Sequence, residues 1–176
     1  NLYTLYVYDA VGRATDIGNV FGTTTIVYDD WYATTTDVLN NKKTLERDAF
    51  QRLKKVDEYG SSAPSPYATT TYNWDALGNL KKITDASGNI RNFEYDMLGR
   101  RTFAEDLHHV ADTQFGSTTY SYDLAGNLIK KVKPDNVVVA YAYDDLNRIL
   151  NEDASSGSGL EADYTYDACS QGVGRL

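Results

Sequence analysis

The amino-acid sequence predicts an all-β protein built as a repetitive antiparallel meander of β-hairpins. Three observations lead to this fold class. Aromatic residues two positions apart, such as Tyr120 and Tyr122, place both rings on one face of a strand. An Asp-x-x-Gly phrase follows at once, here from Asp123 to Gly126, and favours a type I turn with a glycine of positive φ. The phrase returns at a spacing close to 20 residues, which is typical of a repeat array.

Eight copies of this unit can be read along the chain. Their marker aspartates stand at positions 9, 29, 48, 75, 96, 123, 144 and 167, and two of the intervals are lengthened to 27 residues. Eleven of the 15 tyrosines lie in the two aromatic columns of the array, which accounts for the high tyrosine content. The residues expected to define the structural repeat motif are Tyr8, Asp9, Gly12, Trp74, Asp75, Gly78, Tyr95, Asp96, Gly99, Tyr122, Asp123, Gly126, Tyr143, Asp144, Tyr166 and Asp167.

Short strands and turns are expected from the N-terminus onward. Residues 16–19 have the composition of a second turn, which would lead into a Thr-rich strand at 23–28. A further Thr-rich strand is expected at 31–38, with its turn at 40–42. Two prolines and several small polar residues predict a loop at 59–67, because proline cannot take part in a central strand.

The C-terminal half follows the same design. Turns of one type begin at Asp75, Asp85 and Asp96, about ten residues apart, which indicates a β-meander. Residues 106–116 are expected to form an inserted loop, and residues 134–136 another turn. The expected core consists of the aromatic columns and three leucines: Tyr72, Trp74, Tyr95, Tyr120, Tyr122, Tyr141, Tyr143, Leu80, Leu98 and Leu128.

Composition argues against several classes of function. The net charge is -8 and no basic stripe is visible, so nucleic acid is not an expected partner. The longest apolar run, residues 137–143, is far shorter than the ~20 residues that a membrane helix needs, so membrane insertion is not expected. Cys169 is the only cysteine, and no internal disulfide can form.

No sequence motif indicates catalysis, a cofactor or a metal. The repeated aspartates have the ligand type that Ca²⁺ prefers, but each is better explained as a turn residue whose carboxylate accepts backbone N–H bonds. His108 and His109 would point to opposite faces of a strand or be solvated in a loop, and Cys169 has no histidine nearby in sequence. We therefore expect a non-enzymatic chain with no catalytic residue, no cofactor and no metal.

The aromatic columns leave two functions open. Their rings can pack strand against strand as cross-strand pairs of a structural wall. Alternatively, exposed Tyr and Trp rings on an open sheet can stack on sugar rings, which would make the chain a carbohydrate-binding module for a cell-surface glycan. Packing requires the rings to contact the next turn or to face inward, whereas glycan binding requires exposed rings.

The repeat unit resembles a known family. The phrases YDMLGR at 95–100, YDLAGN at 122–127 and YDAVGR at 8–13 are similar to the Tyr-Asp (YD) repeat of the Rhs family. Bacterial Rhs polymorphic toxins, the BC component of Tc toxins, wall-associated proteins and teneurins share this repeat. The lengthened last unit at 166–176 resembles a variant found in bacterial members, and the resemblance covers essentially the whole chain.

The resemblance implies that the hairpins form a curved ribbon, part of a hollow shell that encloses a C-terminal effector domain of a secreted or cell-surface bacterial protein. The partners would be further repeats and that effector domain of the same longer protein. Neither end of the sequence resembles a polar cap, so residues 1–176 are expected to be one array cut from a longer one. The chain has no Asp-Pro phrase of the kind that accompanies self-cleavage in toxin members, so self-cleavage is not expected in this section.

Overall fold

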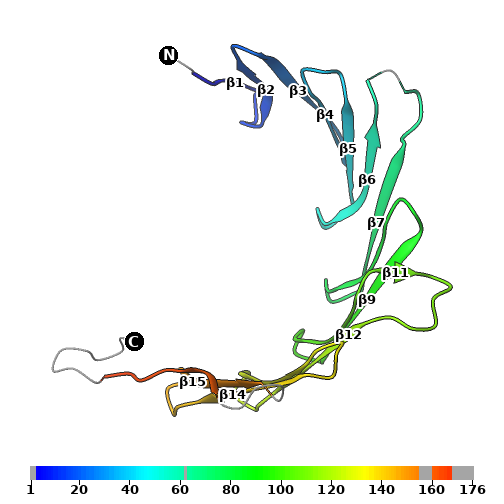
Figure 1. Cartoon of the computed structure of the whole chain (residues 1–176). Coiled ribbons are helices and arrows are strands. Elements are labelled where there is room, and N and C mark those ends of the chain that lie inside the picture. The colour runs from blue at the N-terminus through cyan, green and yellow to red at the C-terminus, as the bar shows by residue number, and fades with distance from the viewer. Residues whose placement is uncertain (1–2, 62, 155–159, 168–176) are drawn as a thin grey trace. The chain divides into compact units, whose positions relative to one another are not determined.

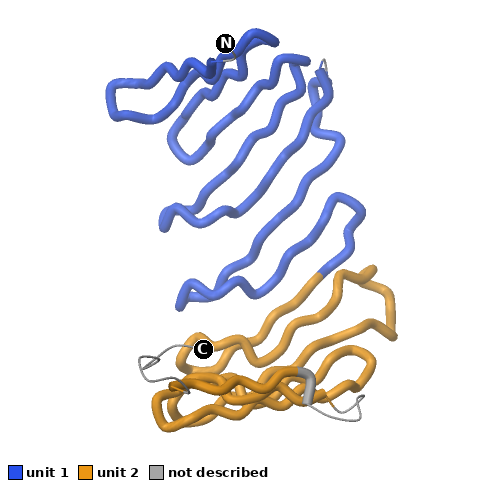
Figure 2. The backbone as a smooth tube through the Cα atoms, turned by 60° about the vertical axis from the view of Figure 1, so that its left-hand side comes forward, with its two compact units in different colours: residues 1–90 blue, residues 91–176 orange. Residues whose placement is uncertain are grey.

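A computed structural model describes residues 3–61, 63–154 and 160–167, and the regular structure of these residues is entirely β-strand (Figure 1). The predicted all-β antiparallel meander is confirmed. The chain forms two compact units, Asn1–Ile90 and Arg91–Leu176 (Figure 2). The strands are β1 (Leu5–Tyr8), β2 (Ala14–Asn19), β3 (Gly22–Asp29), β4 (Tyr32–Thr36), β5 (Lys42–Arg47), β6 (Leu53–Tyr59), β7 (Ala68–Trp74), β8 (Leu80–Thr84), β9 (Asn89–Tyr95), β10 (Arg101–Glu105), β11 (His108–His109), β12 (Ser117–Tyr122), β13 (Leu128–Val132), β14 (Val138–Tyr143), β15 (Ile149–Ala154) and β16 (Leu160–Asp163).

Within each unit the strands lie side by side in chain order. Strands β1 to β8 are successive neighbours in the first unit, and the second unit runs from β9 through β10 and then from β12 to β16. Because each strand runs opposite to the one before it, alternate turns lie on the same edge of a unit's sheet. We call the edge that carries the turns after the marker aspartates the Tyr-Asp edge: it bears the turns 9–13, 29–32, 48–52 and 75–79 in the first unit and 96–100, 123–127 and 144–148 in the second.

A register shift recurs in the hairpins of the Tyr-Asp edge. In the hairpin of β9 and β10, Tyr95 pairs with Arg101 and Glu94 with Phe103, so Thr102 has no partner residue. Such an extra residue bends the strand and increases its local twist. The same shift occurs at the residue before the aspartate in five further hairpins, at Tyr8, Arg47, Trp74, Tyr122 and Tyr143.

The turn predicted at 16–19 is wrong, because these residues belong to β2. Gly18 pairs with Leu5 on one side and with Thr23 on the other, so the chain does not reverse there. The reversal comes after Asn19, whose side-chain oxygen accepts the backbone N–H of Phe21 at 2.8 Å. Gly22, with φ of 138°, supplies the positive φ that the turn requires.

The predicted core needs correction at one leucine. Leu98 is 77% exposed, because it is the third residue of the turn 96–100 and its side chain lies at the tip of the hairpin. The remaining predicted core residues are only half-buried, as expected for a single layer of sheet in which nothing covers either face completely. Among the described residues, the buried hydrophobic side chains are Phe93, Ala104, Val139 and Ala154.

The segment 106–116 contains a short strand where only a loop was predicted. Strand β11 pairs with β9, and His108 is not solvated: its side chain is 7% exposed and its ring stacks on Phe115 at 3.8 Å. Its two ring nitrogens face acceptors, the carbonyl oxygen of His109 at 2.9 Å and the carboxylate of Glu105 at 3.3 Å. Burial acts to lower the pKa of His108, but these acceptors outweigh it and raise the pKa.

Candidate functional site: the joint between successive hairpins

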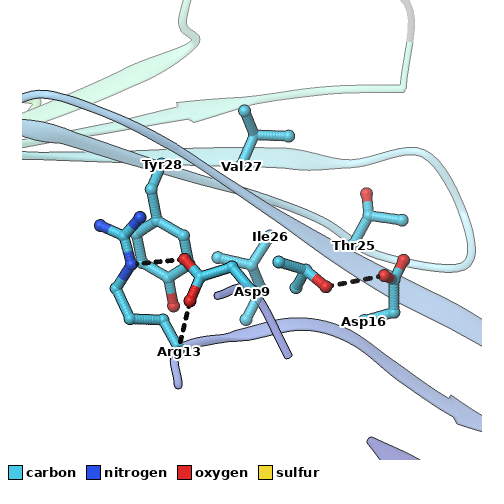
Figure 3. A pocket seen from close by; sticks show the side chains of 8 residues that line it. Asp9, Arg13, Asp16, Thr25, Ile26, Val27 and Tyr28 are labelled. Atoms are coloured by element: carbon cyan, nitrogen blue, oxygen red, sulfur yellow. Dashed lines mark hydrogen bonds and ion pairs between the residues drawn. The ribbon is translucent and has the colours of Figure 1, made fainter. Parts of the chain in front are cut away.

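The marker aspartate closes its own turn through both carboxylate oxygens. In the first hairpin, Asp9 Oδ1 accepts the backbone N–H groups of Val11 at 3.0 Å and Arg13 at 2.9 Å. Its Oδ2 accepts Arg13 Nε at 2.7 Å (Figure 3). Two backbone bonds complete the turn, from Asp9 N to Arg13 O and from Gly12 N to Asp9 O, and Gly12 has φ of 83°. One side chain therefore fixes a five-residue turn.

In six of the eight repeat units, the residue four positions after the marker aspartate is an arginine or an asparagine. Arginine donates Nε to the aspartate at Arg13, Arg52, Arg100 and Arg148, over 2.6 to 2.7 Å. Asparagine donates its side-chain amide in the same way at Asn79 and Asn127, over 3.0 and 2.9 Å. Asn41 and Asn89 repeat the arrangement with Asp37 and Asp85, in turns on the opposite edge of the sheet. The chemistry of the turn is therefore not restricted to one edge.

These bonds hold the pKa of the turn aspartates below the usual range. At Asp75 the largest cause is the bond from the side-chain amide of Asn79, and at Asp9 it is the backbone N–H of Arg13. At Asp96 partial burial pushes the pKa upward, but bonds from the backbone and side chain of Arg100 outweigh it. The ionised carboxylate is therefore the form that holds the turn closed.

The aromatic residue before the aspartate links its hairpin to the preceding one. Tyr122 donates its hydroxyl to the carbonyl oxygen of Arg101 at 2.9 Å, and Arg101 lies five positions after the marker aspartate of the preceding hairpin. The same relation holds in three other places, and it needs a ring with a polar donor at its far end, which Tyr and Trp both have. These bonds join Tyr28 to Ala14, Trp74 to Leu53 and Tyr143 to Leu128, over 3.2, 2.8 and 3.0 Å.

The arginine of one turn also reaches the next hairpin. The Arg100 guanidinium lies over the ring of Tyr122 at 4.7 Å, and its Nη1 donates to the backbone oxygen of Asp123 at 3.1 Å. Figure 3 shows the first such pair, in which Arg13 lies against Tyr28 at 4.2 Å. We call this set of contacts between successive hairpins the hairpin joint. Arg52 makes both contacts with Trp74 and the Asp75 backbone oxygen, whereas Arg148 lies over Tyr166 and donates to the Asp167 carboxylate.

Known proteins share this architecture. A sequence profile of the teneurin YD-shell family matches residues 31–170. The chain belongs to this family. Among solved structures, its fold is similar to TcdB2-TccC3 without the hypervariable C-terminal region, with a TM-score of 0.60 and 16% identity, and to TcdB2-TccC3-Cdc42, with 0.59 and 17%. The Tc holotoxin pore of Photorhabdus luminescens, with a substituted TccC3, gives 0.60 and 16%.

Each of these three alignments covers 93% of this chain and 11% of the solved chain, so the chain spans about a tenth of the length of the structures that it resembles. A comparison with curated protein sequences found no significant match. The resemblance to the Rhs and YD-repeat proteins is confirmed by the family match. Membership of the YD-shell family supports a structural role of the shell type.

The YD motif residues differ in whether they contact the preceding hairpin. Trp74, Tyr122 and Tyr143 contact the preceding hairpin as described, and Tyr95 is half-buried. Tyr8 is 58% exposed and stacks on Tyr6, with ring centroids 6.3 Å apart. The YD glycines Gly12, Gly78, Gly99 and Gly126 all have positive φ, and the lengthened turn beyond residue 167 lies outside the described residues.

Sequence reasoning gave no role to the arginine or asparagine that stands four positions after six of the eight marker aspartates. The signal was present, since Gly12, Gly78, Gly99 and Gly126 are each followed at once by one of these two residue types. Within the part of the chain that the structure describes, no group of three or more His, Cys, Asp or Glu side chains is placed to hold a metal ion. In the same part, no helix is long and apolar enough to cross a membrane.

Replacing Arg100 by Asn should remove the contacts of the hairpin joint while the turn 96–100 stays closed. Asparagine keeps the bond to Asp96, as Asn127 does with Asp123, but it cannot stack on Tyr122 or reach the Asp123 carbonyl. We expect a loss of about 1–2 kcal/mol in the free energy of unfolding, measured by urea denaturation with circular dichroism. Arg100→Ala should cost more, because the turn loses its partner too.

The matched control is Lys130→Gln, which removes an exposed cation from strand β13 of the next hairpin. We expect it to change stability by less than about 0.5 kcal/mol. Equal stability of Arg100→Asn and the unaltered chain would mean that the joint contributes nothing to cohesion between hairpins.

Proposed function

We propose that the chain is a non-enzymatic section of the wall of a YD-repeat shell. In this proposal the shell encloses a C-terminal toxin or effector domain of the same longer protein, and residues 1–176 are one stretch of a longer array. The protein is secreted or displayed at the surface of a bacterial cell. Its partners are further repeats and the enclosed domain, and it has no catalytic residue, metal or cofactor of its own.

The hairpin joint is the observation that carries the proposal. A single sheet buries few side chains, so backbone ladders alone would leave it easily bent or pulled apart. The joints add side-chain bonds between hairpins whose marker aspartates are about 20 residues apart, as between Asp123 and Asp144, where Tyr143 reaches Leu128. A repeat protein is stabilised mainly by contacts between neighbouring repeats, and such contacts are what the wall of a shell requires.

The aromatic columns favour the wall over a glycan-binding sheet. The polar tips of Tyr122 and Tyr143 are used in bonds to the preceding hairpin, and burial raises the pKa of both hydroxyl groups. These rings meet the expectation for packing, namely contact with a neighbouring turn. One of the solved structures of similar fold is TcdB2-TccC3 without its hypervariable C-terminal region. By analogy, this supports a variable C-terminal partner for this chain.

Protease protection tests the containment. The chain is expressed in its full-length protein with the sequence that follows it, and the C-terminal region is monitored during limited trypsin digestion. We expect that region to resist cleavage while the wall is intact and to become sensitive when Gly99→Val and Arg100→Asn are combined. Equal cleavage of the C-terminal region with intact and weakened walls, or the lack of any such region, contradicts containment.

A further inference from the structure

The insertion at 106–116 holds a buried histidine. Its base is closed by the bond from Asp106 N to Gly116 O at 2.7 Å, and within it β11 pairs with β9 (Figure 1). The side chain of His108, in β11, is only 7% exposed, and its ring lies 2° from parallel with that of Phe115, at 3.8 Å. His108 therefore packs at the centre of a segment that departs from the repeat.

Both ring nitrogens of His108 face hydrogen-bond acceptors. Nδ1 lies 2.9 Å from the carbonyl oxygen of His109, which has no proton to donate. Nε2 lies 3.3 Å from Glu105 Oε2, and this oxygen already accepts the backbone N–H of Asn92 at 2.9 Å and its side-chain amide at 2.6 Å. A neutral imidazole has one N–H and can satisfy only one of the two acceptors, whereas an imidazolium donates to both.

The charged groups around His108 come from three elements. Strand β10 supplies the Glu105 carboxylate, and the insertion supplies Asp112, which accepts the backbone N–H of His109 at 2.8 Å. Strand β9 supplies Arg91, whose Nε donates to the backbone oxygen of Glu105 at 2.7 Å. Burial acts to lower the pKa of the His108 imidazole, but the neighbouring carbonyl oxygen and the two carboxylates outweigh it and raise the pKa.

The His108 ring connects β11 to the rest of its unit. Its bond to Glu105 reaches the end of β10, and the same carboxylate continues to Asn92 in β9. Loss of the proton removes one of the two ring bonds and therefore weakens this attachment. The backbone bond between Asp106 and Gly116 does not depend on that proton, so the base of the insertion stays closed in either state.

We propose that the insertion 106–116 is a pH-sensitive latch, in which protonated His108 holds β11 on β9 and neutral His108 releases it. Closure takes up a proton, so the latch is fully closed below the ordinary histidine pKa of about 6.5. It opens as the pH rises through the higher pKa of the closed form. The latch does not depend on an enclosed domain, because its groups all lie in the insertion and in strands β9 and β10.

Hydrogen–deuterium exchange of the chain at about pH 5.5 and about pH 8, on either side of the ordinary histidine pKa, tests the latch. Rates in the insertion are divided by those of a synthetic peptide of residues 106–116 at the same pH, which removes the intrinsic pH dependence of exchange. We expect protection there to fall about tenfold at the higher pH, the change that one unit of pKa difference produces. Protection of β6 should stay constant, because the turn aspartates remain ionised at both pH values.

The two histidines of the chain form a matched pair of variants. His108→Gln keeps a polar side chain that does not titrate, so its protection should be equal at both pH values. His109→Gln should keep the pH response, because this exposed ring accepts only the Ala111 N–H, at 3.2 Å, a bond that an amide oxygen can replace.

An NMR titration of His108 in the unaltered chain serves if His108→Gln does not fold, and it should give a pKa above the ordinary value of about 6.5. Three outcomes overturn the proposal: equal protection of the insertion at both pH values in the unaltered chain, loss of the pH response with His109→Gln instead of His108→Gln, or a His108 pKa at or below the ordinary value.

Discussion

Lowering the pH below about 4 is expected to unfold the array, because its turns are closed by ionised aspartates. Eight turn carboxylates have a pKa below the usual value, so the folded chain binds fewer protons than the unfolded chain. Their contribution to stability is complete above the unfolded aspartate pKa of about 3.9 and is lost as the pH falls through the lower folded values. The eight are Asp9, Asp37, Asp48, Asp75, Asp85, Asp96, Asp123 and Asp144.

Urea denaturation between pH 7 and pH 2, followed by circular dichroism, measures this effect. The midpoint should stay high down to about pH 4 and then fall steeply, since all eight turns lose their anchors over the same range. His108 cannot produce this fall: its raised pKa gives stability that is present below about pH 6.5 and is lost as the pH rises.

The variant Asp96→Asn supplies the control for the acid effect. The amide oxygen can still accept backbone N–H bonds, but the residue no longer titrates. We expect the variant to be less stable than the unaltered chain at pH 7 and to lose less stability on acidification. A midpoint that stays constant between pH 5 and pH 2.5 would mean that the turn carboxylates do not hold the array together.

The turns could be predicted from sequence because each is encoded within five residues. Asp123 to Asn127 contains both the acceptor and the donors that close its hairpin, and the glycine with positive φ stands between them. The prediction failed at 16–19 because it also relied on local composition. Glycine and asparagine occur there, but Gly18 is paired with a strand on each side, and that pairing depends on residues outside 16–19.

The hairpin joint could not be predicted, because it depends on register. Tyr122 reaches Arg101, which lies 21 residues earlier, and the contact depends on the register in which β10 pairs with β12. The periodic pattern identifies which residues recur, but not which carbonyl each ring meets.

Replacing Gly99 by Val is expected to have the largest effect of any single substitution in a turn. Gly99 has φ of 76°, a conformation in which a Cβ crowds the neighbouring carbonyl, and a β-branched side chain tolerates it worst. The variant must either strain this backbone or open the turn that Asp96 closes through the bond from Gly99 N to Asp96 O. We expect a loss of about 1–3 kcal/mol in the free energy of unfolding, measured by urea denaturation.

The chain itself supplies the matched replacement for this test. Asparagine occupies the same place in the turns at Asn40 and Asn147, with φ of 64° and 59°, because its short polar side chain tolerates the left-handed region. Gly99→Asn should therefore keep most of the stability that Gly99→Val loses, and Gly60→Ala, at a glycine with open space around it, should be nearly neutral. If valine and asparagine at position 99 destabilise equally, backbone strain is not the cause, and the loss of stability must come from the tip side chains instead.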